Sequence, residues 1–210
     1  SWLREQSVYL SRFICDVTAY LTDEIHKGKS LMFEAQLGAL RDIDFGIFPY
    51  TSSSSTIAAY GPIGAGIPFA KLDKVIGIMK AYSSCVGEGP FTAEMFGEEA
   101  SALREAGGEY GAATGRPRRV GPFDVVASRY GCMVQGADEI ALTKMDVLSY
   151  MEKIPVCIAY EVDGIQTTDF LTGDRLNRAK PVIEYLDGFC QDISGCRKME
   201  DLPPKAMEYI

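Results

Sequence analysis

The sequence is poor in the residues that bind metals and polyanions. It has one histidine, His26, and six cysteines, none of them in a Cys-x-x-Cys pair. Because zinc sites and disulfide frameworks need characteristic Cys and His spacings, we expect no metal site and six free, buried thiols. Lys and Arg number 21 against 29 Asp and Glu, a net charge of −8. This balance disfavours nucleic acid and anionic membranes as partners.

Two further absences concern membranes and phosphate binding. No apolar run reaches the length of a membrane span and no signal-peptide pattern opens the chain, which predicts a cytoplasmic protein without a membrane partner. The phosphate-loop pattern Gly-x4-Gly-Lys-Ser/Thr is missing, because no lysine follows the glycines of residues 61–66. The 210 residues, 47% of them hydrophobic, suffice for one substantial domain or a domain and a half.

Arginines are concentrated in residues 111–121, GAATGRPRRVG. Arg116, Arg118 and Arg119 each carry a planar fork that matches carboxylate or phosphate, and Pro117 stiffens the loop between them. The segment therefore indicates an anion-binding loop. A basic turn that pairs with surface carboxylates is the alternative.

Hydrophobic spacing and turn residues predict an α/β protein. An Asp-Gly pair at residues 163–164 predicts a β-hairpin. We expect helices at 1–28, 69–81, 98–106, 123–134, 181–185 and 203–210, and strands at 31–34, 82–86, 140–142, 154–160 and 165–170, with buried strands at 31–34 and 140–142 and one buried face on the first helix.

Three polar segments are candidate sites, each with a structural alternative. Asp42 and Asp44 could serve metal or acid–base chemistry, although carboxylates two apart in a turn more often cap the backbone. The hydroxyl run at 51–56 is flanked by apolar residues and predicts an ordered loop rather than a linker. Lys144 and Asp146 follow a strand. The carboxylate suits the guanine N1 and amine and the lysine stem the ring face, but a helix N-cap would explain Asp146 equally well.

Four segments together resemble the adenylosuccinate synthetase family. GAATGRPRRVGPFD is similar to its TTGRRRR loop, and LMFEAQLGALRDIDFGIFPYTSSSST to its FEGAQG…LDIDHGTYP(Y/F)VTSSNT segment. KAYSSCVGEGPFTAEMF resembles KAYTTRVG.GPFPTE, and ALTKMDVL resembles LTKLDVL. The segments follow the family's order, and the resemblance extends from about residue 31 to the end. It implies part of a nucleotide-binding mixed sheet with flanking helices, a P-loop-like fold without its N-terminal phosphate loop.

The resemblance implies GTP-dependent joining of L-aspartate to IMP, with magnesium bridging the phosphates. Its IMP contacts fall on Gln36, Ser52 and Arg116, although in ungapped register Leu37 holds the family's glutamine position. Its aspartate loop falls on Ala112, Ala113, Thr114, Gly115, Arg116, Pro117 and Arg118, with Ala113 and Pro117 departing from the family's Thr and Arg. Its GTP contacts fall on Arg118, Lys144, Met145 and Asp146. Phe45 stands where the family has histidine.

The family's chain is about twice as long, so we expect this sequence to be its central to C-terminal portion. Residues 1–65 would end the central nucleotide-binding sheet region, and 66–210 would form the C-terminal α+β region. The family's general base, general acid and magnesium ligands would then lie outside this chain, which alone would be inactive. Homodimerisation is implied for the full-length protein. A stand-alone, non-catalytic module that binds purine nucleotides or anions is the alternative.

Overall fold

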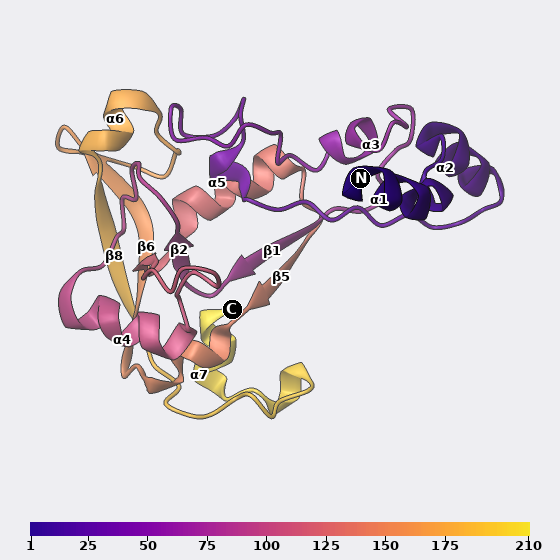
Figure 1. Cartoon of the computed structure of the whole chain (residues 1–210). Coiled ribbons are helices and arrows are strands. Elements are labelled where there is room, and N and C mark those ends of the chain that lie inside the picture. The colour runs from indigo at the N-terminus through magenta and orange to yellow at the C-terminus, as the bar shows by residue number, and fades with distance from the viewer.

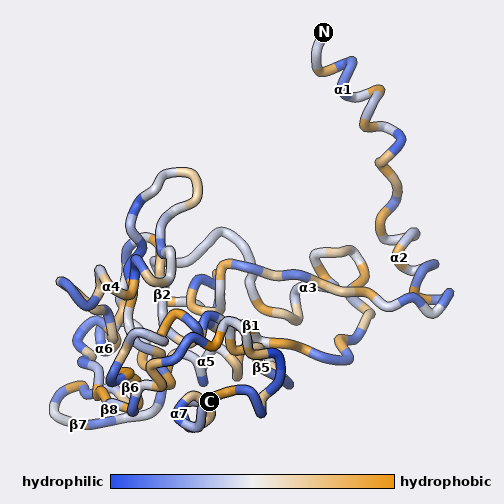
Figure 2. Tube along the Cα trace, turned by 90° about the horizontal axis from the view of Figure 1, so that it is seen from below, coloured by the Kyte–Doolittle hydropathy of each residue, from blue (hydrophilic) through white to orange (hydrophobic).

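The computed structural model describes residues 1–210 and has a mixed α/β architecture, as predicted (Figure 1). At the N-terminus the single predicted helix is wrong. Helices α1 (Trp2–Leu10), η1 (Ser11–Phe13) and α2 (Val17–His26) replace it. The break occurs because the Asp16 side chain accepts a hydrogen bond from the Ala19 N–H and starts a new helix. The predicted buried face is also wrong, since none of these residues is buried and the helices project from the body (Figure 2).

Residues 27–75 contain little regular structure. They form only η2 (Ala39–Arg41) and α3 (Tyr60–Gly64). The strand predicted at 31–34 is absent, because no other segment pairs with this stretch. Gln135 ties the region to the rest of the chain, since its side chain bonds the backbone of Thr56 and Ala58. The division at residues 65 and 66 stays a prediction.

Strands β1 (Ile76–Lys80) and β5 (Glu139–Thr143) form a parallel pair. The helix predicted at 69–81 is therefore wrong; a short apolar run rich in isoleucine does not separate helix from strand by spacing alone. The strand at 140–142 is confirmed, but its burial is not, because Ile140 is exposed. Ile78 is 76% exposed, which leaves apolar surface uncovered on this two-stranded sheet.

Strand β2 (Ser83–Cys85) pairs antiparallel with β3 (Arg119–Gly121). Helix α4 (Gly97–Gly107) lies between them in sequence and ends at Gly108, which adopts the left-handed conformation that glycine favours after a helix. The predicted strand at 82–86 and helix at 98–106 are both confirmed to within two residues at each end. Both predictions used local signals that no distant contact overrides.

The third and largest sheet is built on β6 (Lys153–Val162). Its partners are β4 (Phe123–Asp124), β7 (Ile165–Thr167) and β8 (Lys180–Asp187). The hairpin is confirmed, with Asp163 and Gly164 both at positive φ. The short helix predicted at 181–185 is wrong, because this segment pairs along β6 as β8, and a helix forms just before it as α6 (Gly173–Arg178).

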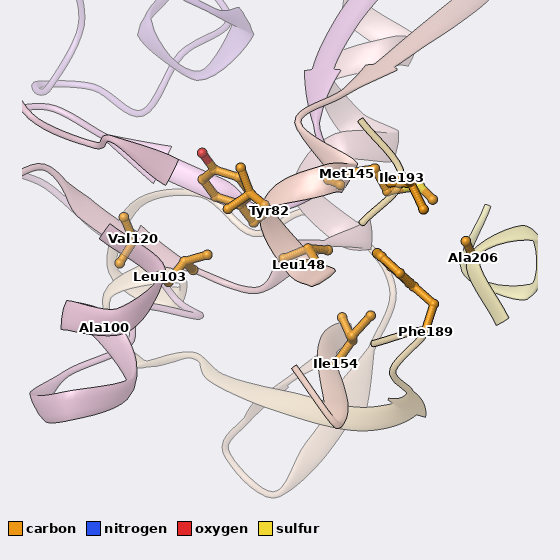
Figure 3. Close-up of a cluster of buried hydrophobic side chains, with 12 residues drawn as sticks. Tyr82, Ala100, Leu103, Val120, Met145, Leu148, Ile154, Phe189, Ile193 and Ala206 are labelled. Atoms are coloured by element: carbon orange, nitrogen blue, oxygen red, sulfur yellow. The ribbon is translucent and has the colours of Figure 1, made fainter. Parts of the chain in front are cut away.

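The remaining elements are α5 (Val125–Gln135), η3 (Met145–Tyr150), η4 (Met199–Asp201) and α7 (Pro204–Tyr209). The predicted helix at 123–134 and the terminal helix are confirmed. The larger core cluster joins α4 and β3 to η3 and the C-terminal segment. Figure 3 shows Leu103 and Val120 on one side of Leu148, with Phe189 and Ile193 on the other.

All six cysteines are free. The expectation that they are buried holds only for Cys157, since Cys15 and Cys190 are exposed and the other three are half-buried. Among the helices, none combines the length and the hydropathy that crossing a membrane requires.

Candidate functional site

The arginine loop is a short antiparallel hairpin. Tyr110 and Pro117 form an isolated bridge, and the Arg118 N–H donates to the Glu109 carbonyl over 2.9 Å. Farther out, the Gly111 N–H donates to the Arg116 carbonyl over 2.9 Å. The tip, residues 112–116, is exposed. The loop thus presents its backbone and the Arg116 side chain to solvent from a fixed base.

Glu109 anchors that base from inside the protein. It is 1% exposed, and its Oε1 accepts hydrogen bonds from Lys80 Nζ and Tyr82 Oη, both at 2.6 Å. Its Oε2 accepts from Arg118 Nη1 at 3.1 Å. Burial raises the pKa of Glu109, but the hydrogen bonds from Lys80 and Tyr82 and the Lys80 charge outweigh it, so the pKa is lowered. Glu109 is therefore ionised and holds one arginine of the loop.

The arginine at the foot of the loop is fully engaged. Arg119 donates from Nε and Nη2 to the two carboxylate oxygens of Glu94, at 2.8 and 2.5 Å. This fork raises the pKa of Arg119. The pairing alternative is therefore correct for Arg119, although Glu94 is largely buried rather than on the surface.

The three arginines consequently differ in what they can still bind. Arg119 is committed to Glu94, and Arg118 shares Glu109 while keeping about a third of its side chain exposed, at 33%. The Arg118 Nε is buried and has no hydrogen-bond partner. Arg116 is exposed and its guanidinium contacts no carboxylate. Arg116 is thus the arginine best placed to receive an incoming anion.

Asp42 organises the second candidate loop. It is fully buried, and its Oδ1 accepts from the Asp44 and Phe45 N–H groups, both at 2.9 Å. Its Oδ2 accepts from the Thr56 N–H at 2.6 Å and Ser55 Oγ at 3.1 Å. Burial raises the pKa of Asp42, but the backbone hydrogen bonds dominate and lower it. Asp42 is thus a structural cap, and the predicted ordered loop at 51–56 is confirmed.

Ser52, which is expected to meet IMP on this loop, is half-buried. The Ser52 N–H donates to the Arg41 carbonyl at 2.7 Å, and Ser52 Oγ donates to the Ser54 carbonyl at 2.9 Å. Gln36 is exposed. Leu37 beside it adopts a positive φ of 78° and is also exposed.

The Lys144–Asp146 segment lies directly after β5. Lys144 adopts the left-handed conformation and its Nζ donates to the Gly107 carbonyl at the end of α4, over 2.9 Å. Met145 packs its side chain into the larger core cluster, so only its backbone is free to contact a ligand. Asp146 is exposed in the first turn of η3, and the N-cap of that helix is Lys144, which excludes the N-cap alternative for Asp146.

The base of the arginine loop and the Lys144–Asp146 segment meet at the carboxyl ends of β1 and β5. Lys80 ends β1, pairs with Thr143 in the register, and reaches Glu109. Lys144 bonds α4 two residues before Glu109. In α/β proteins ligands gather at such strand ends. Sequence reasoning missed Lys80 and Glu109; the only available signal was their position beside recognised segments.

A family model described as adenylosuccinate synthetase matches residues 1–210. This chain belongs to the adenylosuccinate synthetase family. The relatives include adenylosuccinate synthetases of Kineococcus radiotolerans, 41% identical over 202 residues (96% of this chain and 47% of theirs), and of Mycobacterium marinum, 43% identical over 209 residues (99% and 48%). The chain thus spans about half the length of the curated relatives it matches.

Solved structures agree with this membership of the adenylosuccinate synthetase family. A fully ligated adenylosuccinate synthetase from Plasmodium falciparum superposes with a TM-score of 0.93 at 34% identity, over 99% of this chain and 50% of that one. A cyanophage S-2L succinoaminodeoxyadenylate synthetase reaches 0.52 at 22% identity, over 64% and 41%, and supports the fold alone. The resemblance in four segments is confirmed, and with it a family of carbon–nitrogen ligases.

Magnesium, which the adenylosuccinate synthetase resemblance implies, does not fit this chain by itself. No three His, Cys, Asp or Glu side chains converge as a metal-binding group would. Both Asp42 oxygens already accept protein hydrogen bonds, and Asp124 is likewise occupied by the Ala127 N–H and by Tyr160 Oη. No chemical step is therefore derived through a metal here.

Proposed function

We propose that this chain supplies substrate-recognition surfaces of a GTP-dependent ligase that joins L-aspartate to IMP, giving adenylosuccinate, GDP and phosphate. The observation that carries the proposal is the arginine loop held on ionised Glu109, next to Lys144 at the carboxyl ends of two parallel strands. Membership of the adenylosuccinate synthetase family gives the reaction its identity.

The arginine loop suits aspartate and a nucleotide phosphate. Arg116 keeps its guanidinium free, and the backbone N–H groups of residues 112–115 lie on an exposed turn. Arg118, tied to Glu109 on one side, would use its remaining donors toward the GTP side. We assign the aspartate carboxylates to residues 112–118, which supply both kinds of donor.

Lys144 and Asp146 suit guanine. The Asp146 carboxylate is exposed and can accept two hydrogen bonds, from N1 and from the exocyclic amine. Lys144 is oriented by Gly107, so its aliphatic stem would cover the base. Adenine lacks the exocyclic amine at this position, and it would leave the carboxylate unpaired.

IMP would be held by Gln36, Ser52 and Arg116. Gln36 is exposed and carries an amide, whereas the neighbouring Leu37 has none, which favours Gln36 for the family's glutamine role. Ser52 offers a hydroxyl from a loop that Asp42 makes rigid.

Further protein structure is needed for catalysis. Parallel sheets are normally covered on both faces, yet β1 and β5 stand as a pair with Ile76, Ile78 and Ile140 exposed. The helices α1 and α2 bury no residue at all. We propose that these surfaces pack against protein that also carries the base, the acid and the magnesium ligands, and that the complete enzyme is a homodimer. The chain alone should form no adenylosuccinate in a coupled assay.

The recognition roles are tested by nucleotide titration of this chain. Asp146→Asn should weaken GTP binding by one to two decades, since a base-edge contact contributes about 1–3 kcal/mol, and it should favour xanthosine triphosphate instead. Arg116→Ala should weaken IMP binding, while Arg4→Ala on exposed α1 should change the affinity for neither IMP nor GTP. If GTP, ATP and inorganic pyrophosphate bind alike and Asp146→Asn has no effect, the chain is a stand-alone anion-binding module.

A further inference from the structure

Four consecutive carbonyl groups, those of residues 86–89, are held alternately by two arginines. Arg41 Nη2 donates to the carbonyls of Val86 and Glu88, at 3.0 and 3.1 Å. Arg119 Nη1 donates to those of Gly87 and Gly89, at 3.1 and 2.8 Å. The alternation is possible because both glycines adopt a positive φ, 83° and 110°, that side chains disfavour. This turn is therefore clamped between two guanidinium groups.

Each clamp residue belongs to a different binding loop. The Arg41 carbonyl accepts from the Ser52 N–H, and its Nη1 donates to the Tyr50 carbonyl at 2.5 Å, so it fixes residues 50–52 of the Asp42-centred loop. Arg119 directly follows Arg118, and its fork on Glu94 fixes its own position. Both arginines thus act on residues 86–89, and on the preceding Cys85, which bonds Arg41 through Sγ and pairs with Arg119 in the β2–β3 ladder.

Arg41 has no carboxylate partner. Its five hydrogen bonds go to three backbone carbonyls and to the Cys85 Sγ, at 2.8 Å. A half-buried guanidinium bound only to neutral acceptors is not explained by charge pairing. Its geometry serves to fix backbone, because one rigid fork meets carbonyls of two separate segments.

We propose that Arg41 is a positioning residue that couples the Ser52 loop to the arginine loop through the 86–89 turn. The two loops then keep one relative position, as needed if IMP and aspartate are to meet. The significance for these ligands rests on the proposed function; the mechanical coupling does not.

The contact with Cys85 supplies the sharpest test. In the family segments quoted above, leucine stands at the position of Arg41 and arginine at that of Cys85. The two side chains touch in this structure, so one guanidinium can occupy this space from either position. An exchange, Arg41→Leu with Cys85→Arg, should restore the clamp that Arg41→Leu alone removes.

Amide hydrogen exchange of this chain measures the coupling without any ligand. Arg41→Leu should speed exchange at the hydrogen-bonded amides of Gly111, Gly115 and Arg118 by about tenfold or more, while leaving the protected amides of β6 unchanged. The double variant, Arg41→Leu with Cys85→Arg, should return the exchange rates of these amides to within about threefold of wild type. Arg41→Lys, which keeps the charge but lacks the fork, should give an intermediate increase, and Arg4→Leu none.

Unchanged amide exchange at 110–118 in both Arg41→Leu and Arg41→Lys would overturn the proposal. It would also be overturned if the double variant, Arg41→Leu with Cys85→Arg, exchanged these amides as fast as Arg41→Leu. A uniform increase that includes β6 would mean general destabilisation and would also overturn it. IMP titration of the same variants separates the two proposals. If the wild type binds no IMP but the Arg41 variants still speed amide exchange at 110–118, the assigned ligand is refuted and the positioning role stands.

Discussion

Replacing Glu109 should show how strongly the arginine loop depends on one buried carboxylate. Glu109 receives three hydrogen bonds, from Lys80, Tyr82 and Arg118, and two of these donors are cations. Glu109→Ala leaves both cations without their common partner. Glu109→Gln keeps the shape and one acceptor oxygen, but it turns an amide N–H₂ toward the Arg118 guanidinium.

The magnitude follows from burial. Removing one partner of a fully buried ion pair costs about 3–5 kcal/mol. Here the carboxylate side chain is 2% exposed but Lys80 and Arg118 are 29% and 33% exposed, so water partly compensates the cations. We expect a loss at the lower end, about 3 kcal/mol for Glu109→Ala and about 2 kcal/mol for Glu109→Gln. Glu105→Gln, at an exposed carboxylate bonded to Tyr110, should cost under about 1 kcal/mol.

Urea unfolding at several pH values provides the assay. The pKa of Glu109 is lowered in the folded chain, so its stabilisation is complete above the ordinary value of 4.5 and is lost as pH falls through the folded pKa. The difference between wild type and Glu109→Gln should therefore be largest near neutral pH and shrink below about pH 4. A loss under about 1 kcal/mol at pH 7, or one that does not depend on pH, would refute the anchoring role.

Three other predictions concern the scaffold. Asp42→Asn should cost about 2–3 kcal/mol in urea unfolding, because an amide cannot accept all four donors, whereas Asp44→Asn should be near neutral. Gly121→Ala should abolish or severely reduce folding, since its Cβ would lie 2.3 Å from the Ala93 carbonyl oxygen, while Gly131→Ala in α5 has room and should gain up to about 1 kcal/mol in thermal unfolding. Cys157, buried and with its pKa raised to about 12 by burial, should react with a thiol reagent only in denaturant, unlike the two exposed cysteines.

The elements predicted correctly are those whose signals are local. Helix α4 was recognised from a Glu- and Ala-rich run that stops at two glycines, and the β6–β7 hairpin from Asp163 and Gly164. For strands β1 and β8 the local spacing predicts helices, and this is wrong because their conformation is decided by distant partners. The partner of Ile76 is Glu139, and that of Val156 is Glu184, and no window of neighbouring residues contains these pairings.

The candidate site shows the same limit. The arginine loop and the Lys144–Asp146 segment could be located from sequence, and the family that they indicate is confirmed. Which of the three arginines are paired and which is free could not be predicted from sequence, because this depends on which carboxylates reach them. Arg119 is paired by Glu94, 25 residues away, whereas Arg116 has the same charge and no such partner.

This division would let an acidic chain keep the proposed anion site effective. Three free arginines on one turn would repel one another and would pair with whatever carboxylate came near in a protein of net charge −8. Binding Arg119 to Glu94 and Arg118 to Glu109 removes two of them from that competition and makes the loop rigid. The guanidinium of Arg116 then projects from a preorganised base, so an incoming carboxylate or phosphate need not displace an internal partner or order the loop. In the proposed site, Glu109 and the partly buried Glu94 would thus contribute to binding although neither has to touch the ligand.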